Sequence, residues 1–142
     1  MRPYVFGMMH QDDREVFDKV RKAVLLLPDE IDFGLDEKEE PIILSCHILA
    51  RAVARAFSLK FKDGYFCFHW QHSWIVAPHF NIIDVYPVAI LGGPIMVSWD
   101  FGSPRKMLYQ ALPTKVVYKN KFKQPSFLMA VEIVYSLLKN NY

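Results

Sequence analysis

A single carboxylate stands in the middle of an apolar segment, Ile82-Ile83-Asp84-Val85-Tyr86. The β-branched and aromatic residues around Asp84 predict a strand. A carboxylate in such a strand costs free energy unless another element brings it a hydrogen-bonding or charged partner. The fold must therefore place a polar group from another segment beside Asp84.

The segment that precedes Asp84 offers such a partner. A strand that ends at Val76 is predicted to lead into the Asp84 strand through the turn Ala77-Pro78-His79. If Val76 pairs with Phe80 across this turn, the antiparallel register places His72 directly opposite Asp84. Opposed residues have Cβ atoms roughly 4.5–5.5 Å apart, so the carboxylate could hold the imidazole. A slip of one residue would send the two side chains to opposite faces.

A helix is predicted to begin at Ser45, a residue type that favours the N-cap position, and to continue to Phe57. Cys46 then lies in the first turn, at the edge of the apolar face. Backbone N–H groups and the dipole at a helix N-terminus stabilise a thiolate, so this position suits a reactive cysteine. A buried structural cysteine is the alternative for Cys46 taken alone.

The remaining elements define the fold class. An amphipathic helix is predicted from the capping box Asp12…Glu15 to Pro28, and a final helix opens at Gln124-Pro125-Ser126. Further strands are predicted at residues 65–70, 95–99 and 114–118, a turn at Asp63-Gly64, and a short helix around Met107 and Leu108. Strands in the middle and helices at both ends indicate an α+β fold with an antiparallel sheet.

The composition indicates one folded domain over residues 1–142, since 52% of the residues are hydrophobic and 23% are charged. No apolar run reaches the roughly 20 residues that span a bilayer, and residues 1–13 lack the apolar region of a signal peptide. We therefore expect a cytoplasmic protein with no membrane partner. Two cysteines, Cys46 and Cys67, are too few for a disulfide framework and would be free thiols there.

Charge is distributed unevenly along the chain. Residues 1–40 carry 6 Lys/Arg against 11 Asp/Glu, whereas the rest carry 11 against 4. A basic half could attract nucleic acid, but its lysines at 115–123 are typical of a solvated strand and turn. No nucleic-acid-binding motif accompanies them, so we expect no nucleic-acid partner.

Cys46, His72 and Asp84 are the residue types of a thiol-nucleophile triad. The thiolate attacks a carbonyl carbon, the histidine moves protons, and the aspartate fixes the tautomer and orientation of the histidine. The helix N-terminus at Cys46 offers backbone donors for the oxyanion. Trp70 or Trp74, close to His72 in the sequence, could shield the pair from water or contact substrate.

These three blocks resemble a known family. Ser45-Cys46 at a helix start, His72-Ser73-Trp74-Ile75, and Ile82-Ile83-Asp84 are similar to the motifs of transglutaminase-like proteins in the papain-like superfamily, whose small bacterial members are of similar size. The resemblance implies a papain-like core in which the cysteine helix packs on an antiparallel sheet that bears His and Asp. It also implies a cysteine peptidase, amidase or acyltransferase that acts on a peptide or protein substrate without metal or cofactor.

One departure from the family leaves a second function open. Papain-type enzymes have a glutamine several residues before the cysteine as an oxyanion donor, whereas this chain has Glu39-Glu40-Pro41-Ile42-Ile43 there. Gln71, beside His72, is a possible substitute. Without that donor, the chain could be a non-catalytic descendant of the fold that binds a peptide or protein.

A zinc-binding module is the third hypothesis. Cys67 and His69 are predicted to share one face of a strand, and His47, His72 and His79 could lie nearby. No close ligand pair recurs at the spacing of zinc fingers. His10, His47 and His79 are otherwise expected to be surface or turn histidines.

Overall fold

The computed structural model describes residues 9–27, 34–35, 41–42, 46–68, 70–85, 93–98, 108–112 and 124–140, and only the backbone of 34–35, 41–42 and 70. It contains helices α1, α2 and α4, a small sheet of β1 and β2, and a five-stranded sheet. The helices are Gln11–Leu25 (α1), Cys46–Phe57 (α2) and Pro125–Lys139 (α4). The strands are Gly34–Leu35 (β1), Pro41–Ile42 (β2), Lys60–Phe66 (β3), Trp70–Val76 (β4), Ile82–Asp84 (β5), Ile95–Val97 (β6) and Tyr109–Ala111 (β7).

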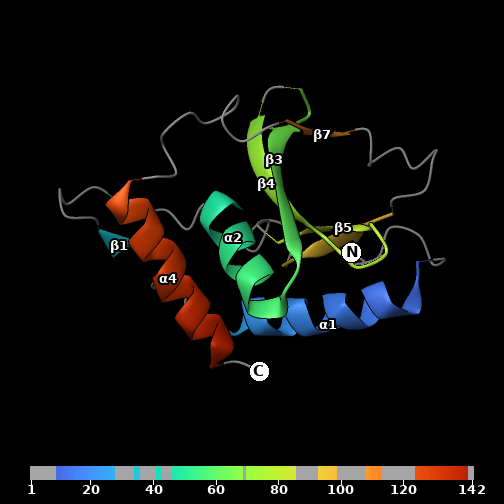
Figure 1. The fold of residues 1–142 in the computed structure, drawn as a ribbon, viewed down its shortest axis with the longest axis horizontal. Helices are drawn as coiled ribbons and strands as arrows, with labels where there is room; N and C mark the ends of the chain where they lie inside the picture. Colours follow the sequence, from blue (N-terminus) through green and yellow to red (C-terminus); the bar gives the residue numbers. More distant parts are fainter. Residues whose placement is uncertain are drawn as a thin grey trace.

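The larger sheet has the order β6-β5-β4-β3-β7, and every neighbouring pair is antiparallel. Helix α2 packs between α4 and strands β3 and β4, and α1 runs across one end of the molecule (Figure 1). The predicted α+β class with an antiparallel sheet is therefore confirmed. Within the described residues, no helix combines the length and the apolar character needed to cross a membrane.

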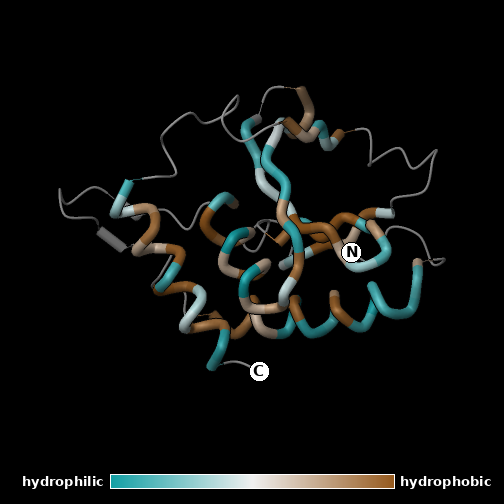
Figure 2. The backbone as a smooth tube through the Cα atoms, viewed as in Figure 1, coloured by the Kyte–Doolittle hydropathy of each residue, from teal (hydrophilic) through white to brown (hydrophobic). Residues whose placement is uncertain are grey.

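Two clusters of buried side chains lie on opposite faces of the sheet. The larger cluster joins α1, α2 and α4 to the sheet and includes Phe17, Leu49, Ile75 and Leu138. The smaller cluster contains Trp74, Ile82, Ile95 and Val97, with Tyr109 packed against it. Alternation along β4 explains the division, because Ile75 and Trp74 point to opposite faces. Figure 2 shows hydrophobic strands in the middle of the view and a hydrophilic N-terminal end of α1.

Helix α1 starts earlier than its sequence pattern predicts. His10, not Asp12, is the N-cap residue, and its Nδ1 accepts a hydrogen bond from the backbone N–H of Asp12 at 3.1 Å. Asp13 is fully buried and accepts bonds from the turn between β4 and β5 instead of serving the helix end. The capping-box prediction was wrong because these acids have tertiary partners.

The turn predicted at Asp63-Gly64 is also wrong, since both residues lie inside β3. Asp63 is buried and paired with Arg51, so its charge is compensated within the strand. Gly64 lies where a Cβ would collide with the carbonyl oxygen of Gln110 on β7 and would come within 2.9 Å of the Trp74 ring. This glycine permits close approach of strands and does not mark a turn.

The β4–β5 register differs from the prediction by two residues. Val76 pairs with Ile82 and Ile75 with Ile83, so the connection runs from Ala77 to Asn81. The longer turn contains Phe80 at φ 73°, a left-handed conformation that a bulky residue rarely adopts and that the sequence does not signal. His72 is therefore not directly opposite Asp84.

Several other predicted elements can be compared with the structure. The final helix is confirmed as α4, and β6 confirms the core of the strand predicted at 95–99. Tyr109–Ala111 form β7, and Cys67 lies in the β3–β4 turn and not within a strand. The predicted strand at 114–118, and residues Ser45, His69 and Met107, lie outside the described residues.

Candidate active site

The three predicted triad residues come from three different elements. Cys46 is the first residue of α2, His72 lies in β4, and Asp84 is the last residue of β5. Cys46 is 6% exposed and Asp84 4% exposed, so both lie at the margin of the core. The structure brings His72 into contact with each of the other two.

His72 and Asp84 form a direct hydrogen bond. Nε2 of His72 lies 2.8 Å from Oδ2 of Asp84, and since a carboxylate accepts, Nε2–H is the donor. A register shift of two residues keeps both side chains on one face and makes them diagonal neighbours, within reach of long side chains. The predicted pair is therefore present although the predicted register is wrong.

The second neighbour of His72 is the Cys46 side chain, whose hydrogen bonding and Coulombic attraction raise the pKa of the imidazole. Nε2 is already bonded to Asp84, so Nδ1 is the ring nitrogen left for the thiol. One imidazole thus links the sulfur to the carboxylate. This order, sulfur then imidazole then carboxylate, is the order that a thiol-nucleophile triad requires.

The protonation of His72 follows from these contacts. Burial disfavours the charged ring, but hydrogen bonds to Asp84 and Cys46, together with their Coulombic attraction, raise the pKa of His72 from 6.5 to about 10. An imidazolium at neutral pH can stabilise a thiolate and later donate its proton. A charged imidazole at this position can donate a proton to a group beside the sulfur.

Tyr109 completes the surroundings of Asp84, and no sequence pattern predicts this contact. Its hydroxyl donates to Oδ2 of Asp84 at 2.8 Å, from strand β7 on the far side of β3 and β4. The Tyr109 ring also lies 5.2 Å from the Trp74 ring and 6.2 Å from the His72 ring. Tyr109 therefore anchors the carboxylate and helps to enclose the imidazole.

Of the other predicted contacts, Trp74 is the one that the structure places beside the histidine. It is 3% exposed, and its ring centroid lies 6.2 Å from that of His72. Gln71 lies on the face of β4 opposite to His72, because successive strand side chains alternate. The Trp70 side chain lies outside the described residues. A second oxyanion donor thus remains unassigned in the part of the chain that is described.

A buried polar network runs directly beside the triad. Arg51 of α2 donates two hydrogen bonds to the carboxylate of Asp63 on β3, at 3.0 and 2.7 Å. Ser73 Oγ donates to the same carboxylate at 2.5 Å, and since this uses its only proton, Nδ1 of His47 donates to Ser73 Oγ at 2.7 Å. The network ties α2 to both central strands.

The hydrogen-bonded network of Arg51, Asp63, Ser73 and His47 includes the residue after Cys46 and the residue after His72. His47 follows Cys46 in α2, and Ser73 follows His72 in β4, so their bond joins the backbone beside the thiol to the backbone beside the imidazole. The expectation of a surface His47 was wrong, since it is 8% exposed. The adjacency of Cys46-His47 and His72-Ser73 in the sequence was the available signal for this link.

Comparisons with known proteins place this chain in no family. A scan against protein-family models, a search of curated proteins and a search of solved structures each found no significant match. We therefore infer function from the geometry of Cys46, His72, Asp84 and their neighbours.

Proposed function

We propose that this protein is a cysteine-type hydrolase or acyltransferase that acts on a peptide or amide bond through Cys46, His72 and Asp84. The observation that carries the proposal is the double contact of His72, with the Cys46 side chain on one side and with Asp84 Oδ2 at 2.8 Å on the other. The position of Cys46 at the first residue of α2 adds support, because the positive end of a helix dipole favours a thiolate.

The proposed reaction has two stages. The Cys46 thiolate attacks the substrate carbonyl carbon, a C–S bond forms, and the carbonyl π electrons move to oxygen. When they return, the bond to the amine breaks and the His72 imidazolium donates its proton to the departing nitrogen. Water or an acceptor amine then attacks the thioester carbonyl and His72 takes its proton. The C–S bond breaks, and the Cys46 thiolate leaves beside the regenerated imidazolium.

The surrounding residues have supporting roles in this proposal. Asp84 holds Nε2–H of His72, so that Nδ1 faces the sulfur, and Tyr109 holds Asp84. Trp74 packs beside the imidazole and keeps bulk water from one side of it. The packing of α2 on an antiparallel sheet that carries His72 and Asp84 supports the papain-like, transglutaminase-like arrangement as the fold of this site.

A small activated ester tests the chemistry without knowledge of the natural substrate. We expect p-nitrophenyl acetate to leave one acetyl group on Cys46, detected by mass spectrometry of the intact protein and of its peptides. Cys46→Ala should abolish the adduct, and His72→Ala should slow its formation at least about 100-fold at neutral pH. Cys67→Ala is the matched control, because Cys67 is also a free thiol but lies in the β3–β4 turn. Acetylation of Cys67 in place of Cys46 would contradict the proposal.

Low exposure of the site favours one alternative, a non-catalytic descendant that binds a peptide or protein. Cys46 is 6% exposed and the His72 side chain 12% exposed, which leaves little surface for an incoming carbonyl. In that case the triad is a structural hydrogen-bond network. Failure of Cys46 to acylate, combined with a lower free energy of unfolding in Cys46→Ala and His72→Ala, would favour this alternative.

A further inference from the structure

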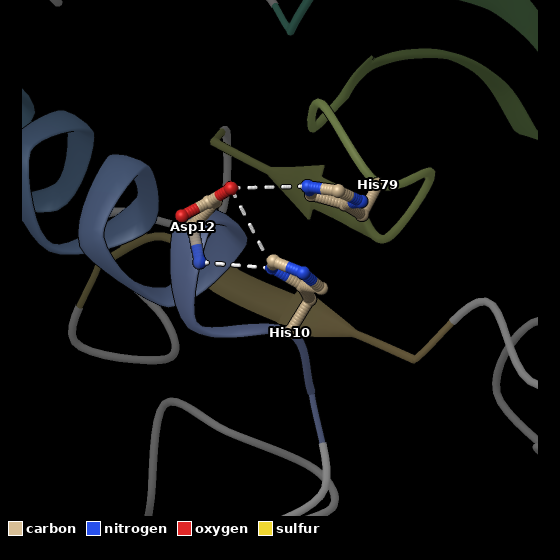
Figure 3. Close-up of side chains that lie close together, drawn as sticks. All are labelled: His10, Asp12 and His79. Atoms are coloured by element: carbon tan, nitrogen blue, oxygen red, sulfur yellow. Dashed lines mark hydrogen bonds and ion pairs between the residues drawn. The ribbon is translucent and has the colours of Figure 1, made fainter.

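A cluster of two histidines and one aspartate lies away from the candidate active site. His10 precedes α1, Asp12 lies in its first turn, and His79 lies in the turn between β4 and β5 (Figure 3). All three are exposed, and one ligand atom from each lies within 4.8 Å of the other two. The Asp12 carboxylate lies beside the two stacked imidazole rings, and each ring directs a nitrogen toward it (Figure 3).

We propose that His10, Asp12 and His79 bind a divalent transition-metal ion of the zinc class. The proposal is independent of the proposed enzyme function. It differs from the zinc module predicted from the sequence, which involved Cys67 and His69. His79 is the one residue that the two hypotheses share.

The distances suit such an ion. Nε2 of His79 lies 3.1 Å from Oδ2 of Asp12, and Nδ1 of His10 lies 3.8 Å from the same oxygen. Two ligand atoms on a tetrahedral zinc ion, each about 2.0–2.1 Å from the metal, are about 3.3–3.4 Å apart. These two separations lie on either side of this value, so rotation of the exposed side chains would close the site.

The two imidazole rings must turn to bind a common ion. The His10 and His79 imidazoles are stacked with centroids 3.5 Å apart and planes 13° from parallel. An ion lies close to the plane of each imidazole that binds it, so rotation of one exposed ring out of the stack would let both nitrogens reach the same ion. His10 Nδ1 now accepts the Asp12 backbone N–H, and an ion would take that lone pair while water satisfies the exposed amide.

The ligand types decide which metals fit. Two imidazoles and one carboxylate suit Zn²⁺, Co²⁺ or Ni²⁺, whereas Ca²⁺ and Mg²⁺ prefer sites built wholly of oxygen. Three protein ligands leave a fourth position for water or another group. No thiol is part of the cluster, which gives the site a distinct spectroscopic signature.

The backbone around the cluster is already held in place by Asp13. Its fully buried carboxylate accepts the backbone N–H of His79 at 2.8 Å and the side-chain amide of Asn81 at 2.8 Å. The start of α1 and the β4–β5 turn are thus fixed to one another without the ion. A preformed framework lowers the ordering cost of binding. The ion would add a second link between α1 and the hairpin that carries His72 and Asp84.

Cobalt and zinc titrations of untagged protein test the proposal. Because Cys46 and His72 could also bind zinc, the parent protein for the test carries Cys46→Ser, and all variants are made in that background. We expect one equivalent of Co²⁺ with tetrahedral or five-coordinate d–d bands and no thiolate-to-cobalt charge-transfer band. Zinc at a hundredfold excess over its Kd should raise Tm by about 5–10 °C.

Four variants locate the ion. His79→Ala and Asp12→Asn should each weaken binding on the order of 100-fold and abolish the zinc-induced rise in Tm, while circular dichroism confirms that these exposed substitutions leave the fold intact. Asp18→Asn, which removes one exposed charge from the same helix, should change binding less than about twofold. His79→Cys should restore binding and add the charge-transfer band.

Three results would overturn the proposal. The first is no binding of either metal up to about 1 mM. The second is binding that His79→Ala and Asp12→Asn leave unchanged. The third is a thiolate charge-transfer band in the parent protein, because that would place the ion at Cys67.

Discussion

Tyr109 and His72 hold the same carboxylate oxygen, Oδ2 of Asp84, each at 2.8 Å. The two donors come from β7 and β4, which are separated by β3 in the sheet. Because Oδ2 of Asp84 accepts from both donors, the position of the carboxylate is fixed by two strands. The orientation of His72 toward Cys46 therefore depends on an edge strand that carries no triad residue.

Tyr109→Phe removes one of the two donors and keeps the ring. We expect the free energy of unfolding to fall by about 1–2 kcal/mol, measured in urea, because Asp84 is 4% exposed and loses a hydrogen bond. Tyr65→Phe, on neighbouring β3, is the matched control and should change stability by less than about 0.5 kcal/mol. Equal effects of the two variants would contradict the role assigned to the Tyr109 hydroxyl.

Ser73→Ala tests the network that joins the two halves of the site. It removes the donor to Asp63 and the acceptor of His47, so we expect a loss of about 2–3 kcal/mol of stability. We also expect slower alkylation of Cys46, because His47 and Ser73 no longer connect the backbones of α2 and β4. Ser136→Ala, exposed on α4, should leave both quantities unchanged. Loss of stability with an unaltered alkylation rate would show that the network only stabilises the fold.

Gly64→Ala tests the close approach of β3 and β7. A Cβ at this position collides with the carbonyl oxygen of Gln110, so β7 must move and carry Tyr109 away from Asp84. We expect a loss of about 2–3 kcal/mol of stability and faster amide hydrogen exchange in β7 than in α1. Unchanged protection of residues 109–111 would argue against the tight pairing.

The raised pKa of His72 gives an alkaline pH dependence. Its folded pKa of about 10 lies above the unfolded value of 6.5, so the stability that it contributes is fully present below about pH 6.5 and is lost as pH rises through about 10.

Between about pH 6.5 and 10 folded His72 keeps a proton that the unfolded histidine has lost. We therefore expect the free energy of unfolding to fall by up to about 1.4 kcal/mol per pH unit over this window. His72→Gln should remove this component, and the difference between the two proteins isolates it from other titrating groups. NMR of ¹⁵N-labelled histidine should show a charged His72 ring at pH 8, and a neutral ring at that pH would contradict the structure.

The sequence predicted the α+β class with an antiparallel sheet and the contact between His72 and Asp84, because these depend on local patterns. The apolar surroundings of Asp84 required a partner, and His72 supplies it although the turn is two residues longer than predicted. Phe80 in a left-handed conformation lengthens that turn, and no local preference indicates it. Strand side chains alternate between the two faces of a sheet, so a register shift of two residues keeps His72 and Asp84 on the same face. The predicted contact therefore survives the wrong register.

The missed features all depend on contacts between distant residues. Tyr109 lies 25 positions from Asp84, and Asp13 meets the β4–β5 turn 66 positions away. Asp63-Gly64 has the composition of a turn, yet Arg51 neutralises the aspartate and the β7 backbone requires the glycine. Tertiary pairing thus overrides local turn signals at these positions.

The most direct test of the account is the alkylation of Cys46 by iodoacetamide as a function of pH. At pH 6 an ordinary thiol of pKa about 8.5 is only about 0.3% ionised, so a thiolate paired with charged His72 should react on the order of 100-fold faster than Cys67. His72→Ala should remove this advantage. Rapid labelling of Cys46 at pH 6 that depends on His72 is the predicted result. Labelling that begins only above about pH 8 and is the same in His72→Ala would contradict a catalytic role for the triad.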